Sequence, residues 1–308
     1  EQVMRNMRIV TDHVSGRRER DHPCRGRRWE VVRVLSDEAG LDYWIAPDGD
    51  FWRAISFIGG AESFDIIQNS EHAREVGFAL GMFHSLVSDL PAGKLADTLE
   101  GFHITPRYLR HYDRILEEKG AGRSPEEKYA LRFVNEQRAL ADVLEEAKMQ
   151  GRLCLRPIHG DPKVNNFMID TTTGRAVSMI DLDTVKPGLV HYDIGDCLRS
   201  CCNLLGEETE QWEAVQFDPD LCRTILHGYL PVAKNFLSEM DYEYLYDGVR
   251  LIALELGLRF FTDYLEGNVY FKVSHPKHNL ARALVQFRLA ESIESQEKTI
   301  CAMFRDMR

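Results

Sequence analysis

The sequence has no long hydrophobic run and no excess of positive charge. No stretch of 18 apolar residues occurs among the 308 residues, so no membrane-spanning helix is predicted. Lysine and arginine number 38 against 49 aspartates and glutamates, and the net charge of −11 argues against nucleic acid or an anionic membrane as the main partner. No charged segment followed by an apolar one opens the chain, so no secretory signal is expected.

Cysteine is scarce and irregularly placed. Seven cysteines, an odd number without regular spacing, favour reduced thiols in a cytoplasmic protein over a disulfide framework. Cys197, Cys201 and Cys202 suggest a metal site, but no second Cys/His pair with ligand spacing accompanies them. We interpret them as buried apolar thiols on a helix. The length suits one large domain or two lobes with a sizeable core.

The most informative stretch of the chain combines polar residues with a predicted β-hairpin. Residues 157–166 have the sequence PIHGDPKVNN. Apolar runs at residues 167–169 and 176–180 then flank a turn at residues 172–174, a pattern typical of a short hairpin. The polar residues on either side of these runs should therefore meet at one end of the hairpin.

Asp161, Asn166 and Asp181 fall at that end and form the set that phosphoryl transfer needs. A carboxylate orients the attacking hydroxyl and accepts its proton, while an amide and a second carboxylate hold Mg²⁺ against a triphosphate. Asp161 and Asn166 have the Asp-x-x-x-x-Asn spacing of the kinase catalytic loop. Lys163 lies close enough to reach the transferred phosphate as a point charge. The alternative, a plain turn and a plain strand end, explains each piece but not their joint order and spacing.

The first sixty residues predict a helix followed by a small antiparallel sheet. The helix is expected over residues 1–15, where Gly16 stops it, and a basic, solvent-exposed loop is expected over residues 17–28. Gly59 and Gly60 are expected to link a small lobe to a large one. The predicted strands, with a hairpin turn at Pro47–Asp50, are Trp29–Leu35, Leu41–Ala46 and Phe51–Ile58.

The rest of the chain predicts a mainly helical lobe. Ser70 is expected to cap a helix that Pro91 ends. His84, beside the apolar stripe of this helix, is expected to be a core or interlobe histidine and not a ligand. Ser124 begins a capping box for another helix. The further predicted helices are Thr105–Lys119, Ser124 to about Met149, His191 to about Leu204, and most of residues 219–305 with breaks near Pro231, Gly267 and residues 274–276.

These motifs resemble those of a known family. His-Gly-Asp-x-x-x-x-Asn, then Ile-Asp-Leu-Asp, then Tyr-Asp-Ile-Gly-Asp at residues 192–196 resemble the aminoglycoside phosphotransferase/choline kinase superfamily. Within it, residues 181–188 (DLDTVKPG), 101–106 (GFHITP) and 258–272 (LRFFTDYLEGNVYFK) look like the N-acetylhexosamine 1-kinase branch. The likeness covers essentially the whole chain.

The resemblance implies an α+β, protein-kinase-like bilobal fold. A small, partly missing, β-rich N-lobe would precede a large, mainly helical C-lobe with a β-hairpin catalytic insertion. Residues 1–60 would be the remnant of the nucleotide-binding lobe and its hinge, and residues 61–308 the catalytic and substrate-binding lobe. Neither the family's Gly-rich loop and phosphate-binding Lys nor its sugar-contacting His has a counterpart here, so we interpret the sequence as an N-terminally truncated copy.

The resemblance also implies roles for single residues near the catalytic motif. Asp161 would be the base that acts on the anomeric hydroxyl of a sugar. Asn166 and Asp181 would be the magnesium ligands. Asp193 would be a structural anchor that hydrogen-bonds the catalytic loop.

Further roles fall outside that motif. Phe57, Ile58 and Gly59 would form the interlobe hinge and offer backbone groups to the adenine of ATP. Arg259 and Tyr270 would contact the hexosamine. As alternatives, Arg259 would extend along the surface of its helix or pair with Asp263, and Tyr270 would belong to the core.

The sequence thus predicts a kinase that moves the γ-phosphate of Mg·ATP to the 1-hydroxyl of N-acetylglucosamine or N-acetylgalactosamine. We expect a cytoplasmic monomer whose partners are ATP and a small sugar. Two alternatives stay open. One is the same chemistry on another small alcohol, such as choline, an aminoglycoside or homoserine. The other is a non-catalytic pseudokinase or binding module, which the missing Gly-rich loop and Lys suggest.

Overall fold

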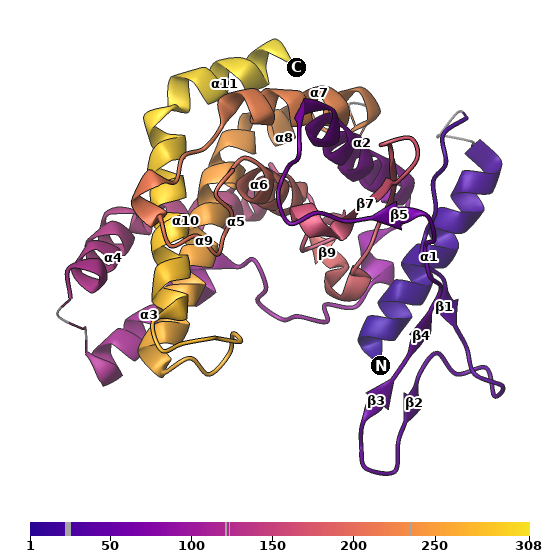
Figure 1. Cartoon of the computed structure of the whole chain (residues 1–308), viewed down its shortest axis with the longest axis horizontal. Helices are drawn as coiled ribbons and strands as arrows, with labels where there is room; N and C mark the ends of the chain where they lie inside the picture. Colours follow the sequence, from indigo (N-terminus) through magenta and orange to yellow (C-terminus); the bar gives the residue numbers. More distant parts are fainter. Residues whose placement is uncertain (22–25, 121, 123, 234–235) are drawn as a thin grey trace. The chain divides into compact units, whose positions relative to one another are not determined.

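The computed structural model describes residues 1–21, 26–120, 122, 124–233 and 236–308 (Figure 1). The chain forms two compact units. The expected border at residue 60 stays a prediction. Within the described ranges, no helix combines the length and the apolar character needed to cross a membrane. Unit 1 comprises residues 1–100, 155–193 and 223–237, and unit 2 comprises residues 101–154, 194–222 and 238–308.

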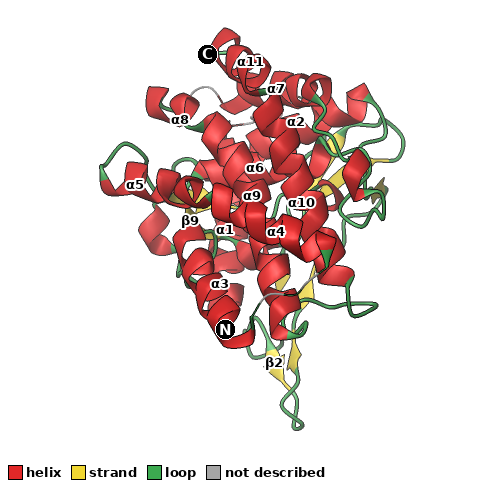
Figure 2. Ribbon diagram, turned by 90° about the vertical axis from the view of Figure 1, so that its left-hand side faces the viewer, coloured by secondary structure: helices red, strands yellow, loops and turns green. Residues whose placement is uncertain are grey.

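All described strands belong to unit 1, whereas unit 2 is helical. Figure 2 shows that helices make up most of the chain. The elements of unit 1 are α1 (Gln2–Asp21), β1 (Val34–Leu35), β2 (Trp44–Ile45), β3 (Phe51–Trp52), β4 (Ala54–Ile55), β5 (Ala61–Glu62), α2 (Ser70–Val87), β6 (Arg156–Ile158), β7 (Phe167–Asp170), β8 (Ala176–Met179) and β9 (Lys186–Gly188). Those of unit 2 are α3 (Thr105–Lys119), α4 (Pro125–Glu136), α5 (Val143–Met149), α8 (Glu239–Glu243), α9 (Leu245–Glu266), α10 (His278–Ser295) and α11 (Glu297–Asp306). Helices α6 (Val190–Cys201) and α7 (Pro219–Ala233) contribute residues to both units.

Helix α1 is longer than predicted. It buries Met7, Val10 and Val14, which recur at helical spacing, but it continues through Gly16 to Asp21. A glycine inside a helix costs only about 1 kcal/mol. Beyond it, the Arg17 guanidinium donates to the carbonyl of Ser85 near the C-terminal end of α2, where a cation is favourable. This contact helps the helix to persist past the glycine.

The basic segment is not a solvated loop where it is described; residues 22–25 of that prediction lie outside the described residues. Arg27 forms an ion pair with the buried Glu75 of α2. Arg28 pairs with Asp170 at the end of β7, at 2.7 Å. Backbone N–H groups of the following turn and the Arg28 guanidinium lower the pKa of Asp170 to about 2. Both arginines thus join the N-terminal segment to the central part of unit 1.

The N-terminal sheet is smaller than predicted. The expected strands shrink to the two-residue pairs β1–β4 and β2–β3. The hairpin at Pro47–Asp50 is confirmed, because Trp44 pairs with Trp52 and the Ala46 N–H donates to Asp50 O at 2.8 Å. Figure 1 shows the β2–β3 hairpin beyond the β1–β4 pair, near the bottom of the view. Trp44 and Trp52 remain more than half exposed.

Helices α2 and α7 approach each other closely through glycines. A Cβ on Gly77 would lie 1.9 Å from Ile225 O, and one on Gly228 would lie 2.0 Å from Arg74 O. Helix α2 starts one residue earlier than predicted: Asn69, not Ser70, is the N-cap, and its side chain accepts the His72 N–H. The helix also ends at Val87, before Pro91.

Unit 2 is held together by α9 and α10, which pack side by side (Figures 1 and 2). Gly257 permits this contact, because a Cβ there would lie 2.5 Å from the ring of Phe287. The Ser124 capping box is confirmed, but the predicted helix to Met149 is interrupted after Glu136. Its C-terminal part forms a separate helix, α5.

Two further expectations concern α6 and α7. Cys197, Cys201 and Cys202 are buried thiols, as predicted. The predicted break near Pro231 is confirmed, because α7 includes Pro231 and ends two residues later, at Ala233. A proline beyond the first turn removes a backbone hydrogen bond and crowds the carbonyl four residues before it, which favours a helix end at this point.

Candidate active site

The hairpin β7–β8 brings the predicted catalytic residues to one end of unit 1. Phe167 pairs with Met179, and one step further the Ile180 N–H donates to Asn166 O at 3.0 Å. Asp181 therefore follows directly beside Asn166. The arrangement expected from the two apolar runs is the one that the structure has.

The loop before the hairpin depends on a glycine. Gly160 has φ 85°, and a Cβ there would lie 2.7 Å from Thr184 O. The Thr184 hydroxyl donates to His159 O at 2.7 Å, which binds the loop to the turn that follows Asp181. His159 is fully buried, and its Nε2 lies 3.0 Å from Ile180 O. Any side chain at position 160 would separate these two segments.

Asp193, near the start of α6, holds this loop through backbone hydrogen bonds. Its carboxylate accepts the N–H groups of His159 and Gly160 at 2.7 and 2.8 Å. It also contacts His84 Nε2 at 2.8 Å, and the other ring nitrogen of His84 lies 2.9 Å from the Tyr229 hydroxyl. Burial alone would raise the pKa of Asp193, but the hydrogen bond from His84 and the other contacts outweigh it and lower that pKa. His84 is a core histidine, as predicted.

Asp161 lies between a cation and an amide. Lys163 Nζ is 2.7 Å from Asp161 Oδ2, and both side chains are partly exposed. The Asn166 amide donates to Asp161 O at 2.7 Å, which connects the two ends of this loop. A partly exposed carboxylate beside a lysine is able to orient a hydroxyl and stabilise a nearby phosphoryl group.

Asp181 is held in an unusual backbone conformation. Its φ and ψ are 63° and 58°, a left-handed geometry that aspartate tolerates better than most residues and that often marks functional sites. Within the described residues, no hydrogen bond or ion pair engages its carboxylate. Arg53 instead forms a bidentate ion pair with Asp183, at 2.7 and 2.8 Å.

Asn166 and Asp181 fit a magnesium ion chemically. They offer hard amide and carboxylate oxygens, the ligand type that Mg²⁺ prefers. Their number suits an ion that takes its other ligands from phosphates and water. The described residues contain no group of three or more His, Cys, Asp or Glu side chains able to hold a metal without such help.

The predicted hinge residues differ in exposure. Ile58 is buried, whereas Phe57 is 89% exposed. The carbonyl of Gly59 already accepts a hydrogen bond from the Arg28 guanidinium. Beyond the hinge, Gly60 O accepts the Thr171 N–H at 3.1 Å, which joins this segment to the hairpin turn.

Arg259 of α9, in unit 2, lies among aromatic rings. Its guanidinium carbon is 5.2 Å from the ring of Phe102, 5.1 Å from Tyr108 and 5.4 Å from Phe271. No hydrogen bond or ion pair to Arg259 exists within the described residues, so the alternative of a pair with Asp263 is wrong. Tyr270 is 73% exposed, so the alternative of a core tyrosine is wrong as well.

A buried carboxylate, that of Glu255, lies next to the Arg259 cluster in α9. Glu255, one turn before Arg259, accepts a hydrogen bond from Thr105 at 2.7 Å and contacts His103 Nδ1 at 2.9 Å. Burial alone would raise the pKa of Glu255, but His103 and the charge of Arg259 outweigh it and lower that pKa. Burial raises the pKa of Tyr108 to about 12.

Sequence reasoning missed several of these residues. Phe102, His103 and Thr105 lie in the stretch of residues 101–106 that carried the family resemblance, so a signal existed without an assigned role. The contacts of Arg53 and His159 had no local signal.

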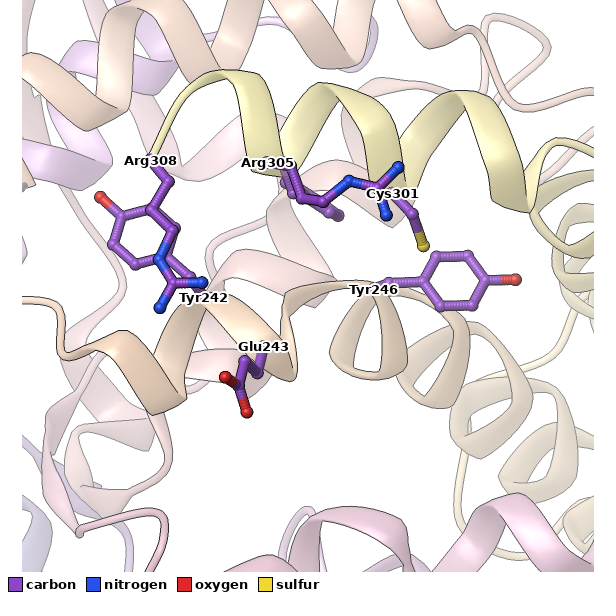
Figure 3. A pocket seen from close by; sticks show the side chains of 7 residues that line it. Tyr242, Glu243, Tyr246, Cys301, Arg305 and Arg308 are labelled. Carbon is purple, nitrogen blue, oxygen red and sulfur yellow. The ribbon is translucent and has the colours of Figure 1, made fainter.

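The two described cavities of unit 2 contain none of the predicted site residues. One, of about 250 Å³, lies between α8, α9 and α11 and is lined by tyrosines and arginines (Figure 3). The other, of about 800 Å³, lies between residues 204–220 and α10. The candidate chemistry is therefore not located in either of them.

Comparison with known proteins assigns the chain to a family. The family model described as the phosphotransferase enzyme family matches residues 4–224, more than half of the chain. The chain belongs to the phosphotransferase enzyme family. The match includes Asp161, Asn166 and Asp181.

Solved structures of this phosphotransferase family type have the same fold. An aminoglycoside phosphotransferase from Alicyclobacillus acidocaldarius is 16% identical with a TM-score of 0.59, and the match covers 98% of this chain and 82% of that one. A microcompartment-associated aminopropanol kinase is 16% identical with a TM-score of 0.61, and the match covers 96% of this chain and 83% of that one. A choline/ethanolamine kinase family protein from Mesorhizobium loti is 13% identical with a TM-score of 0.55, and the match covers 98% of this chain and 83% of that one. The predicted protein-kinase-like α+β fold is confirmed.

Proposed function

We propose that this phosphotransferase is a kinase that moves the γ-phosphate of Mg·ATP to the anomeric 1-hydroxyl of an N-acetylhexosamine, as a cytoplasmic monomer. The observation that carries the phosphotransfer is the Asp161 loop, with Lys163 at 2.7 Å and a backbone anchored by the buried Asp193. Such a loop is prepared for chemistry before any substrate binds, which is how phosphotransferases lower the barrier.

In this proposal, Asp161 orients the sugar hydroxyl toward the phosphorus and accepts its proton as the new P–O bond forms. Lys163 gives up part of its contact with Asp161 to neutralise the charge on the transferred phosphoryl group. ADP leaves as the bond to its β-phosphate oxygen breaks. The anchoring of His159 and Gly160 keeps Asp161 in position through these steps.

Nucleotide binding is assigned to two parts of unit 1. Asn166 and Asp181 would hold Mg²⁺, which would supply positive charge to the phosphates of the nucleotide. The backbone of Phe57, Ile58 and Gly59 would contact adenine. The carboxylate of Asp181, which the described residues leave without an ion pair, supports the first assignment.

Acceptor recognition is assigned to Arg259 and Tyr270. The guanidinium lies among three rings and forms no direct ion pair within the described residues, so we assign its N–H donors to hydroxyl or acetamide oxygens of the acceptor. A cationic acceptor such as choline or an aminoglycoside would be repelled by this charge. The exposed Tyr270 supplies a ring and a hydroxyl of the kind that sugars contact.

The first experiment measures ADP release with Mg·ATP and four acceptors: N-acetylglucosamine, N-acetylgalactosamine, choline and kanamycin. We expect turnover with the two acetylated sugars only. Asp161→Asn should lower kcat about 100- to 10,000-fold, the usual contribution of a general base. The exposed Asp48→Asn, in the β2–β3 turn, is the matched control and should leave turnover unchanged.

Other results would change the assignment in defined ways. Turnover with choline or kanamycin would replace the sugar by an amino alcohol or aminoglycoside and keep the kinase. A folded chain that turns over none of the four, yet binds sugar, would favour the non-catalytic binding module.

A further inference from the structure

The segment that follows α9 reverses direction within two residues. Gly267 ends the helix with φ 100°, and Asn268 continues with φ 62°. Two consecutive left-handed residues turn the chain sharply, so residues 269–271 lie back against the end of the helix. This segment carries Tyr270, to which the proposed function assigns acceptor contact.

A single carboxylate organises the reversed segment. Asp263, in the last turn of α9, is 3% exposed. Its Oδ1 accepts the N–H groups of Val269 and Tyr270, both at 2.8 Å, and its Oδ2 accepts the N–H of Phe271 at 3.0 Å. Three consecutive backbone donors therefore converge on one side chain.

A fourth donor comes from α10. The Asn279 amide donates to Asp263 Oδ2 at 2.7 Å and to Asn268 Oδ1 at 3.0 Å. Asn279 is fully buried, and Arg282 donates to its oxygen at 3.3 Å. The cluster thus connects the helix end, the turn and the next helix.

The cluster also fixes the ring that lies against Arg259. Phe271 packs on Phe260 with ring centroids 4.6 Å apart, and its ring is 5.4 Å from the Arg259 guanidinium. Tyr270 contacts the same ring edge-on, at 4.8 Å. Both aromatic side chains belong to residues whose backbone N–H groups donate to Asp263.

We infer that Asp263 is a positioning residue for acceptor binding. It holds residues 269–271 so that Phe271 covers Arg259 and Tyr270 faces the acceptor, and it touches no substrate itself. The inference rests on the proposed function, because it assumes that Arg259 and Tyr270 bind the acceptor. On this inference, part of the affinity for an oxygen-rich sugar comes from the fixed backbone of residues 269–271.

Only a carboxylate satisfies this cluster. Four N–H donors converge on Asp263, and an ionised carboxylate accepts at both oxygens without donating. In Asp263→Asn, the new NH₂ group would face at least two of these donors. Hydrogen bonds to a charged acceptor are stronger than those to a neutral one, and a buried donor left without a partner adds to the loss.

The test combines two measurements on Asp263→Asn. Hydrogen exchange reports the protection of the amides of residues 269–271. Calorimetric titration with N-acetylglucosamine, in the Asp161→Asn background, reports acceptor affinity without turnover. We expect faster exchange at these amides and an acceptor Kd raised about tenfold or more, the equivalent of 1.4 kcal/mol, with the affinity for Mg·ATP unchanged. Glu266→Gln, at the end of the same helix but outside the cluster, should match the parent chain in each assay.

Each other outcome is decisive. Unchanged exchange, or faster exchange with unchanged sugar affinity, overturns the positioning role. If the parent chain binds neither acetylated sugar, the loop has no acceptor to position and the inference fails. If the parent chain binds sugar but shows no kinase turnover, and this binding depends on Asp263, the proposed reaction is refuted while the positioning role of Asp263 stands. If Asp263→Asn does not fold, Asn279→Ala removes one donor and leaves the backbone bonds. It should raise the Kd by a smaller factor, and an unchanged Kd overturns the role.

Discussion

At the scale of single residues, Asp193 connects the core of unit 1 to its chemistry. It accepts two backbone N–H groups of the catalytic loop and contacts His84, while it is itself fully buried. Breaking such a buried arrangement is costly, because the remaining donors lose their acceptor inside the protein. The geometry of Asp161 therefore depends on a carboxylate that belongs to another segment of the chain.

This dependence predicts how stability changes with pH. The pKa of Asp193 is lower in the folded chain than the value of about 3.9 in an unfolded one. Between these two values the unfolded chain binds more protons, so the free energy of unfolding should fall as the pH drops through this interval and should be fully present above it. Asp193→Asn should lower the free energy of unfolding at pH 7 by about 3 kcal/mol and flatten this acid dependence. Urea unfolding between pH 2.5 and 7 measures both effects.

The exposed Asp48→Asn is a suitable comparison for that series, because its side chain lies in a surface turn. It should keep the stability and the acid dependence of the parent chain. A profile of Asp193→Asn that parallels the parent at every pH would contradict the role of this carboxylate.

At the scale of elements, α1 supports the segment that contains Asp181. Asn6 of this helix is 1% exposed and donates to Val185 O at 2.9 Å and to Ala96 O at 2.8 Å. Its oxygen accepts the Ala96 N–H at 2.9 Å. One amide therefore joins the helix to two loops, one of which follows Asp181 by four residues.

Replacing this amide should destabilise unit 1. Asn6→Leu keeps the branched shape of the side chain but leaves one N–H and two carbonyls without this partner, at about 1–3 kcal/mol each. We expect a loss of about 3 kcal/mol or more in the free energy of unfolding, measured by urea titration. Gln2→Ala, an exposed change at the start of the same helix, should alter it by less than about 0.5 kcal/mol. Equal stability of the two variants would refute the support that Asn6 provides.

The elements also show which predictions the sequence supports. The hairpin β7–β8, the capping box at Ser124 and the turn at Pro47–Asp50 follow from local patterns, and each is confirmed. The extent of α1 was not predictable, because the contact of Arg17 with Ser85 joins residues far apart in the sequence. The low helix propensity of Gly16 is outweighed by that tertiary contact.

At the scale of the whole molecule, the same distinction separates the predictable part of the site from the rest. Asp161 and Asn166 lie five residues apart, so their spacing alone indicates their relation. The link from His84 to Asp193 spans 109 residues. The rings around Arg259 come from segments before and after it. Contacts of this kind depend on the folded chain, and no periodicity or spacing encodes them.

The assignment of Asn166 and Asp181 to the metal predicts a change in the stability of the entire chain. A ligand that binds only the folded state raises the free energy of unfolding by about 2.7 kcal/mol at 100 times its Kd. Mg·ATP should therefore raise the Tm, and ATP with EDTA should raise it much less. Asp181→Asn should remove most of the magnesium-dependent part, because it takes away one of the two hard oxygen ligands. Asp183→Asn is the matched comparison two residues away, since Arg53 already engages that carboxylate. It should keep most of the shift with Mg·ATP. If Mg·ATP raised the Tm of the parent chain and of Asp181→Asn equally, the metal would be bound elsewhere. Loss of a side chain that binds the metal must weaken Mg·ATP binding and so reduce the stabilisation that Mg·ATP gives.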